Sequence, residues 1–143
     1  MNKEVFTQIC NRVETVSTLR WIDWDSGQLD TLNQRPAVAF PACLVDISYP
    51  ACDDISQFGQ IVTANVTLRL AFMPAGETNH KSPVRDEALA VFDVVEAVHN
   101  ALQGWGSDEL SNFSRLNAQP EKRKDGLKVY RITYQTAFTE TAE

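Results

Sequence analysis

The sequence is poor in the features that mark disordered, collagen-like or membrane-spanning chains. Its 143 residues include only 6 Gly and 6 Pro, while 43% are hydrophobic and 22% are charged. No apolar run approaches the roughly 20 residues of a membrane-spanning helix, and the start MNKEVFTQIC lacks the apolar core of a signal peptide. These absences predict one globular domain over residues 1–143, in the cytosol and without membrane association.

Cysteine and histidine are also scarce. The three cysteines, Cys10, Cys43 and Cys52, are odd in number and form no CxxC pair, which argues against a disulfide framework. Combining Cys43 and Cys52 with His80 or His99 gives a spacing that matches no zinc pattern. His99 falls on the buried side of a predicted helix, where a hydrogen-bonded boundary histidine is commoner than a catalytic base.

Catalytic signatures are missing as well. There is no Gly-rich phosphate loop, GxSxG or HExxH motif. Asp53 and Asp54 could join Asp46 or Glu77 around a divalent ion, but a lone acidic pair in a loop is more often solvated. The sequence therefore predicts no catalytic residue, no metal, no cofactor and no enzymatic activity.

Basic charge is confined to one segment. The chain carries a net charge of −6, but residues 115–131 hold six basic and two acidic side chains, which leaves −10 elsewhere. The acidic balance argues against a general nucleic-acid-binding surface. Unlike patches on one chain suit head-to-tail or ring contacts between copies. The alternative is a solvated hairpin turn whose charges keep it unpaired.

Hydrophobic periodicity predicts a helix and three strands in the first half. Val5, Ile9, Val13 and Val16 form one stripe of an amphipathic helix over residues 3–18. The clearest strand covers residues 61–72, where apolar and polar residues alternate. The other expected segments are a short strand at 21–28, a strand at 37–48 that is an edge or bulges at Pro41, and a polar loop at 49–60.

The second half predicts a helix and a hairpin. Ser82 and Pro83 mark the start of a helix that reaches Gln103 and ends at Gly104. Two apolar strips on this helix predict a central position, covered on more than one side. The remaining expected segments are a flexible loop at 74–81, strands at 113–119 and 127–138 joined by a turn at 120–126, and a frayed tail at 139–143.

This order predicts an α+β fold with a mainly antiparallel sheet packed by two helices, in the order α-β-β-β-α-β-β. Four aromatic residues fall near turns or outside clean periodic positions: Trp24, Phe58, Trp105 and Phe113. Such side chains either close the ends of a core or anchor a protein partner.

Nearly the whole chain resembles one family in the order, length and character of its segments. It is similar to the tail terminator or tail-completion proteins, a class of minor tail proteins, of long-tailed bacteriophages. The resemblance includes the ending Ala101, Leu102 and Gly104 of the second helix. Its other parts are an N-terminal amphipathic helix, a short Trp-bearing strand, and the segments RPAVAFPACLVDI, LRLAF, EALAVFDVVEAVHNALQGW and KDGLKVYRITYQTAF.

The resemblance implies a structural, non-catalytic protein that forms a six-membered ring on the tail tube. Such a ring stops tube polymerisation and joins the tube to the head connector, while genomic DNA passes through an acidic channel without specific binding. Its implied partners are itself, the major tail tube protein and the head-tail connector protein. The implied location is the host cytoplasm during assembly and then the virion tail.

The expected interface combines acidic, aromatic and basic residues. Loops at 53–59 and 75–81 would order on the tube, and reversing Lys122, Arg123 and Lys124 to Glu would loosen assembly while leaving the monomer folded. Alternatives are a head-completion or connector protein, a small-molecule-binding domain with a pocket near His99 and Trp105, and a plain adaptor. The expected interface residues are Asp53, Asp54, Phe58, Glu77, Arg115, Lys122, Arg123 and Lys124.

Overall fold

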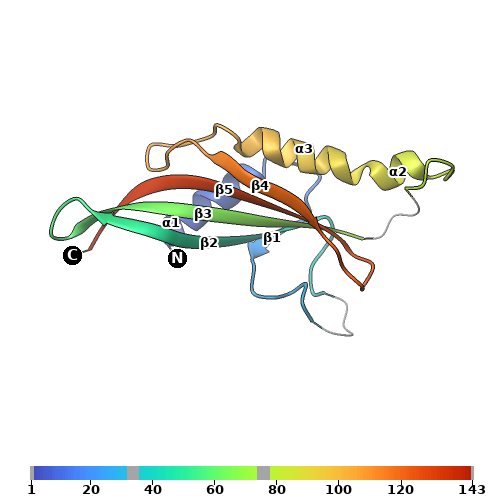
Figure 1. The fold of residues 1–143 in the computed structure, drawn as a ribbon, viewed down its shortest axis with the longest axis horizontal. Helices are drawn as coiled ribbons and strands as arrows, with labels where there is room; N and C mark the ends of the chain where they lie inside the picture. Colours follow the sequence, from blue (N-terminus) through green and yellow to red (C-terminus); the bar gives the residue numbers. More distant parts are fainter. Residues whose placement is uncertain (1, 32–35, 74–77, 143) are drawn as a thin grey trace.

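The computed structural model describes residues 2–31, 36–73 and 78–142 (Figure 1). One sheet has the strand order β1-β2-β3-β5-β4, and only the β1–β2 pair is parallel. The predicted α+β class and element order are confirmed, with the second helix divided into two segments. The elements are α1 (Lys3–Val13), β1 (Trp21–Trp24), β2 (Ala42–Asp54), β3 (Gly59–Phe72), α2 (Arg85–Leu89), α3 (Val91–Leu102), β4 (Ser114–Glu121) and β5 (Lys128–Thr141).

The main core lies between the helices and one face of the sheet. Val66, Leu68 and Leu70 of β3 are fully buried there, together with Ile9 of α1 and Leu102 of α3. This face is the apolar face that the alternation over residues 61–72 predicts. Asn2 caps α1, because its side-chain oxygen accepts hydrogen bonds from the backbone N–H groups of Glu4 and Val5.

The second helix differs from its prediction in start and in environment. It begins at Arg85 rather than at the Ser82–Pro83 pair, which forms a preceding turn, and it is interrupted at Ala90. Only Val98 and Leu102 of α3 are buried, whereas Phe92 is 55% exposed. The prediction of a central helix covered on several sides is therefore wrong for the part of the chain that the structure describes. Gly104 follows the helix with a φ of 77°, which confirms the predicted terminator.

The predicted bounds of the β2–β3 hairpin are also wrong. β2 begins at Ala42, directly after Pro41, and its register shifts between Ser48 and Ala51, a stretch that includes Pro50. The expected loop at 49–60 is mostly strand, since only residues 55–58 lie outside β2 and β3. Its polar composition reflects exposure on a projecting hairpin rather than the absence of a strand.

The projecting end of this hairpin, residues 51–63, is called the arm here. It extends beyond both helices at one end of the sheet (Figure 1). Gly59, Gln60 and Ile61 of the arm pair with Thr141, Glu140 and Thr139 of β5. The expected fraying from residue 139 is therefore wrong, because β5 continues to Thr141 against the arm.

Among the described residues, apolar side chains also cover the opposite face of the sheet, at the end away from the arm. A second, smaller apolar cluster there includes Leu29 and Val38 from the β1–β2 connection, packed on Leu44, Ala71 and Val129. Within the described ranges, no helix combines the length and apolarity that a membrane crossing requires.

Candidate assembly surfaces

The acidic and aromatic residues expected at the interface lie together on the arm. Asp53 and Asp54 end β2, Phe58 stands in the turn, and all three are exposed. Asp54 accepts a hydrogen bond from the Gln60 side chain at 2.9 Å, and the backbone N–H of Ala142 donates to the Phe58 carbonyl at 2.7 Å. The arm is thus a paired strand structure with an exposed tip. Glu77 lies outside the described residues.

The basic residues do not form one patch. Arg115 lies at the start of β4, opposite Tyr134, whereas Lys122 and Lys124 lie in the turn between β4 and β5. Lys122 follows Arg115 by seven positions along the chain, which corresponds to about 23 Å of extended strand at roughly 3.3 Å per residue. The turn lies at the end of the sheet opposite the arm (Figure 1).

Arg123 points into the molecule rather than to solvent. Its side chain is 14% exposed and contacts Asp125 at 2.6 Å and Glu121 at 3.4 Å, and it also donates to the Leu29 carbonyl. Arg123 therefore holds the turn to the β1–β2 connection. The triple reversal at 122–124 would remove these contacts of Arg123, so we now expect it to destabilise the monomer as well as to loosen assembly.

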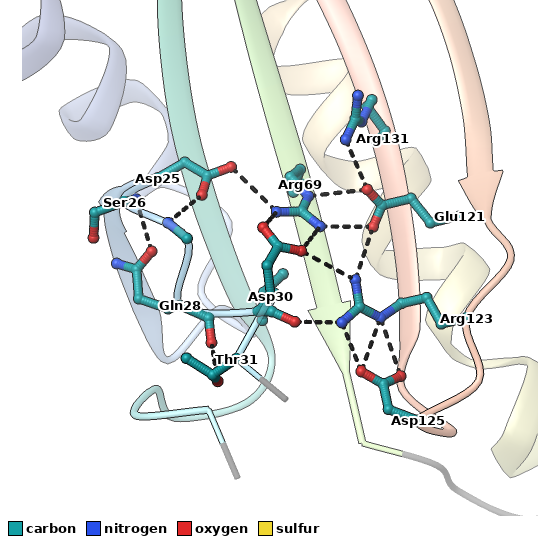
Figure 2. A network of polar contacts seen from close by, with 12 residues as sticks. Asp25, Ser26, Gln28, Asp30, Thr31, Arg69, Glu121, Arg123, Asp125 and Arg131 are labelled. Atoms are coloured by element: carbon teal, nitrogen blue, oxygen red, sulfur yellow. Dashed lines mark hydrogen bonds and ion pairs between the residues drawn. The ribbon is translucent and has the colours of Figure 1, made fainter. Parts of the chain in front are cut away.

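Arg69 of β3 is the centre of a polar network that the sequence did not predict (Figure 2). Its guanidinium group binds Glu121 in a bidentate arrangement, at 3.0 Å and 2.9 Å. It also donates to both carboxylate oxygens of Asp30 at 3.1 Å and to Asp25 at 3.5 Å. The Arg69 side chain is only 7% exposed, so these carboxylates compensate a charge that is largely removed from water.

The network joins three distant segments of the chain. Glu121 receives further contacts from Arg131, at 2.8 Å, and from Arg123. Asp25 and Asp30 follow β1, Arg69 lies in β3, and the other members lie in or beside the β4–β5 hairpin. Each carboxylate faces a guanidinium group, so the ion pairs hold the segment after β1, strand β3 and the β4–β5 hairpin together.

The ion pairs lower the pKa of three carboxyl groups. The hydrogen bond from Arg69 lowers the pKa of Asp30, and the one from Arg123 lowers the pKa of Asp125. Burial acts to raise the pKa of Glu121, but the contacts with Arg69 and Arg131 outweigh it and lower that pKa as well. The folded state therefore holds these groups ionised more strongly than the unfolded chain does.

Acid is expected to weaken the fold through these groups. Because their folded pKa values are lowered, they contribute full stability above the unfolded values of about 4, and the contribution is lost as pH falls through the lower folded values. Chemical denaturation from pH 7 to pH 3 should show a free energy of unfolding that declines below about pH 4. The decline should be shallower in an Arg69→Met variant, and identical slopes in the two proteins would contradict the role of the network.

His99 and its neighbours form a packed cluster rather than an open site. The His99 Nδ1 atom lies 2.9 Å from the Tyr134 hydroxyl, and the two rings stack. Burial, followed by the charge of Arg115, lowers the pKa of His99, which favours the neutral ring. Phe113 is 1% exposed, and its ring packs against Trp105 at a centroid distance of 5.2 Å.

The four singled-out aromatic residues therefore divide into two pairs. Trp105 and Phe113 close one end of the core, whereas Trp24 and Phe58 are 53% and 58% exposed. Among the described residues, no three His, Cys, Asp or Glu side chains form a group that could hold a metal ion.

Together these features define an α+β domain with α1 and α3 packed on one sheet face, an acidic arm at one end and a basic turn at the other. Its fold is similar to that of a chain in the solved structure titled "Virion of native gene transfer agent (GTA) particle". The similarity has a TM-score of 0.56 and 12% sequence identity, and it covers 94% of this chain and 92% of that chain. At this identity the similarity establishes a shared fold. No protein-family model matches the sequence, and no curated protein matches it.

Proposed function

We propose that this chain is a structural protein of a phage-like particle that forms a ring at the head-proximal end of the tail tube, as tail terminators do. The observation that carries the proposal is the fold shared over 94% of the chain with a component of a gene transfer agent virion. The similar fold and the family resemblance of the sequence both favour a structural protein of a phage-like particle.

The charge distribution supports a ring through which DNA moves. Unlike charges at the two ends of the sheet favour head-to-tail contacts, and repeated head-to-tail contacts close a ring when the rotation between copies permits it. The excess of −10 outside residues 115–131 suits a channel that repels the DNA backbone. The proposed partners are other copies of the chain, the tail tube protein and the head connector.

Deleting the gene from a particle-producing genome tests this function. Without a terminator, tubes should grow beyond their normal length and remain unattached to heads, and the wild-type gene supplied in trans should restore joined particles. Electron microscopy of the lysate measures both effects. Tails of normal length without heads would instead indicate a connector, and unchanged particles would contradict both roles.

A further inference from the structure

The tip of the arm is apolar and acidic. Ile55, Phe58 and Ile61 are 55%, 58% and 43% exposed, although each is a residue type that is usually buried. Asp53 and Asp54 flank them, and residues 51–63 contain no Lys or Arg. Large exposed apolar side chains at the end of a paired hairpin are typical of a surface that is covered by a protein partner.

The opposite end of the sheet contains an apolar groove. Two adjoining hollows, of about 290 Å³ and 370 Å³, lie between the second helix and the ends of β3 and β5. Phe72, Ala88 and Val91 line both hollows, and Lys128 borders both. We call this pair of hollows the end groove. Hollows of this size accept a large apolar side chain.

The end groove accounts for the second apolar strip of the second helix. Ala88, Val91 and Val94 belong to the second apolar strip that predicted cover on another side of this helix, and all three line the groove. Within residues 2–31, 36–73 and 78–142, no segment fully covers this strip, and Phe92 of the same helix is 55% exposed. An apolar group from outside the chain would complete the burial that the helix pattern predicts.

The arm and the end groove of one chain cannot meet. The arm and the strand ends that border the groove lie at opposite ends of the sheet (Figure 1). β3 runs from Gly59 in the arm to Phe72 in the groove, and its 14 residues span about 43 Å at roughly 3.3 Å per residue.

A second copy of the chain can supply an arm whose apolar tip suits the apolar groove and whose aspartates suit the basic residues beside it. The Asp53 and Asp54 side chains of that copy would face Lys128 and the basic turn. The acidic residues that line the groove are Glu87 and Glu121, and Glu121 is already paired with Arg69 and Arg131.

We propose that the arm of one copy inserts Phe58 into the end groove of the next copy. This contact is heterologous, so that every copy offers one arm and one groove, as a closed ring requires. Phe58 supplies the apolar anchor, and the aspartates set orientation through the basic side chains. The assignment rests on the proposed function for its biological setting, but the contact itself is testable in the isolated chain.

Disulfide trapping in the purified full-length chain tests the contact. Gln57→Cys at the arm tip and Glu87→Cys at the groove rim are introduced together in a Cys52→Ser background, which removes the exposed native thiol. Burial raises the pKa of Cys10 to about 11 and raises that of Cys43, so both remain protonated and slow to react. At high chain concentration, oxidation should give a ladder of dimers and longer chains joined through positions 57 and 87.

Two controls keep the result specific. A Gln57→Cys/Ser17→Cys pair places the second thiol outside the groove and should give no such ladder. In sedimentation, Phe58→Asp should weaken self-association at least about 30-fold, the effect of an interface hot spot, whereas Trp24→Ser removes a comparably exposed aromatic side chain and should not. A ladder no stronger than the control pair, or equal association of Phe58→Asp and wild type, would overturn the contact.

The same variants separate this contact from the proposed function. Particles that assemble normally with Phe58→Asp, in a genome where deletion of the gene gives overlong tails, would overturn the contact and leave the terminator role standing. A specific 57–87 ladder from a chain whose deletion leaves particles unchanged would support the contact and overturn the function.

Discussion

Replacing Arg69 by Met should destabilise the protein by about 3 kcal/mol, the lower range for breaking a buried ion pair. The substitution keeps an unbranched apolar stem of similar length, but it removes the guanidinium group that binds Glu121, Asp30 and Asp25. Glu121 is only 17% exposed, so its carboxylate keeps a large desolvation cost with fewer compensating contacts. The free energy of unfolding from denaturant titration measures the loss.

Arg115→Met provides the matched control. It removes the same group from an exposed position of β4, so its effect should remain within about 0.5 kcal/mol. Equal losses in the two variants would show that the network contributes nothing specific. A loss below about 1 kcal/mol in Arg69→Met would show that water compensates these carboxylates as well as Arg69 does.

Charge reversal in the turn should affect different properties at adjacent positions: at Arg123 it should lower stability, and at Lys122 and Lys124 it should slow self-association. Arg123→Glu places a carboxylate beside Asp125 and Glu121 and should cost about 3 kcal/mol of stability. Lys122→Glu combined with Lys124→Glu changes exposed side chains and should leave the free energy of unfolding within about 0.5 kcal/mol. The lysine pair should instead slow self-association at low salt, because it removes the attraction between the turn and an acidic arm.

Denaturant titration and light scattering at two salt concentrations distinguish these effects. A folded, stable Arg123→Glu protein would contradict the inward role of Arg123. A Lys122→Glu/Lys124→Glu protein whose self-association matches wild type at every salt concentration would show that the turn does not take part in the contact between copies.

Most of the fold follows from periodicity in the sequence. The stripe Val5, Ile9 and Val13 and the alternation along β3 are local patterns that a single buried face imposes on a helix or strand, and the structure confirms both. The ends of β2, β3 and β5 were missed because the core ends at Val62, so the tip of the arm beyond it has no core beneath it. A strand that is exposed on both faces has no alternation of apolar and polar residues, so periodicity does not reveal it. Hydrogen bonds to distant backbone segments hold such a strand in place.

The polar network could not be predicted from local patterns. Arg69 occupies a polar position in an alternating strand, which is equally compatible with solvent exposure. Its partners Asp30 and Glu121 lie 39 and 52 residues away, and each belongs to a charged or turn segment that commonly remains solvated. The second helix shows the reverse case, because its apolar strip predicted a cover that none of the described segments provides.

Locating the chain in purified particles tests the central claim most directly. Gold-labelled antibody and electron microscopy should place it at the junction of head and tail, and mass spectrometry of the same particles should detect it as a stoichiometric component. Absence from the particles, or labelling spread along the tube, would contradict a ring at the head-proximal end of the tail.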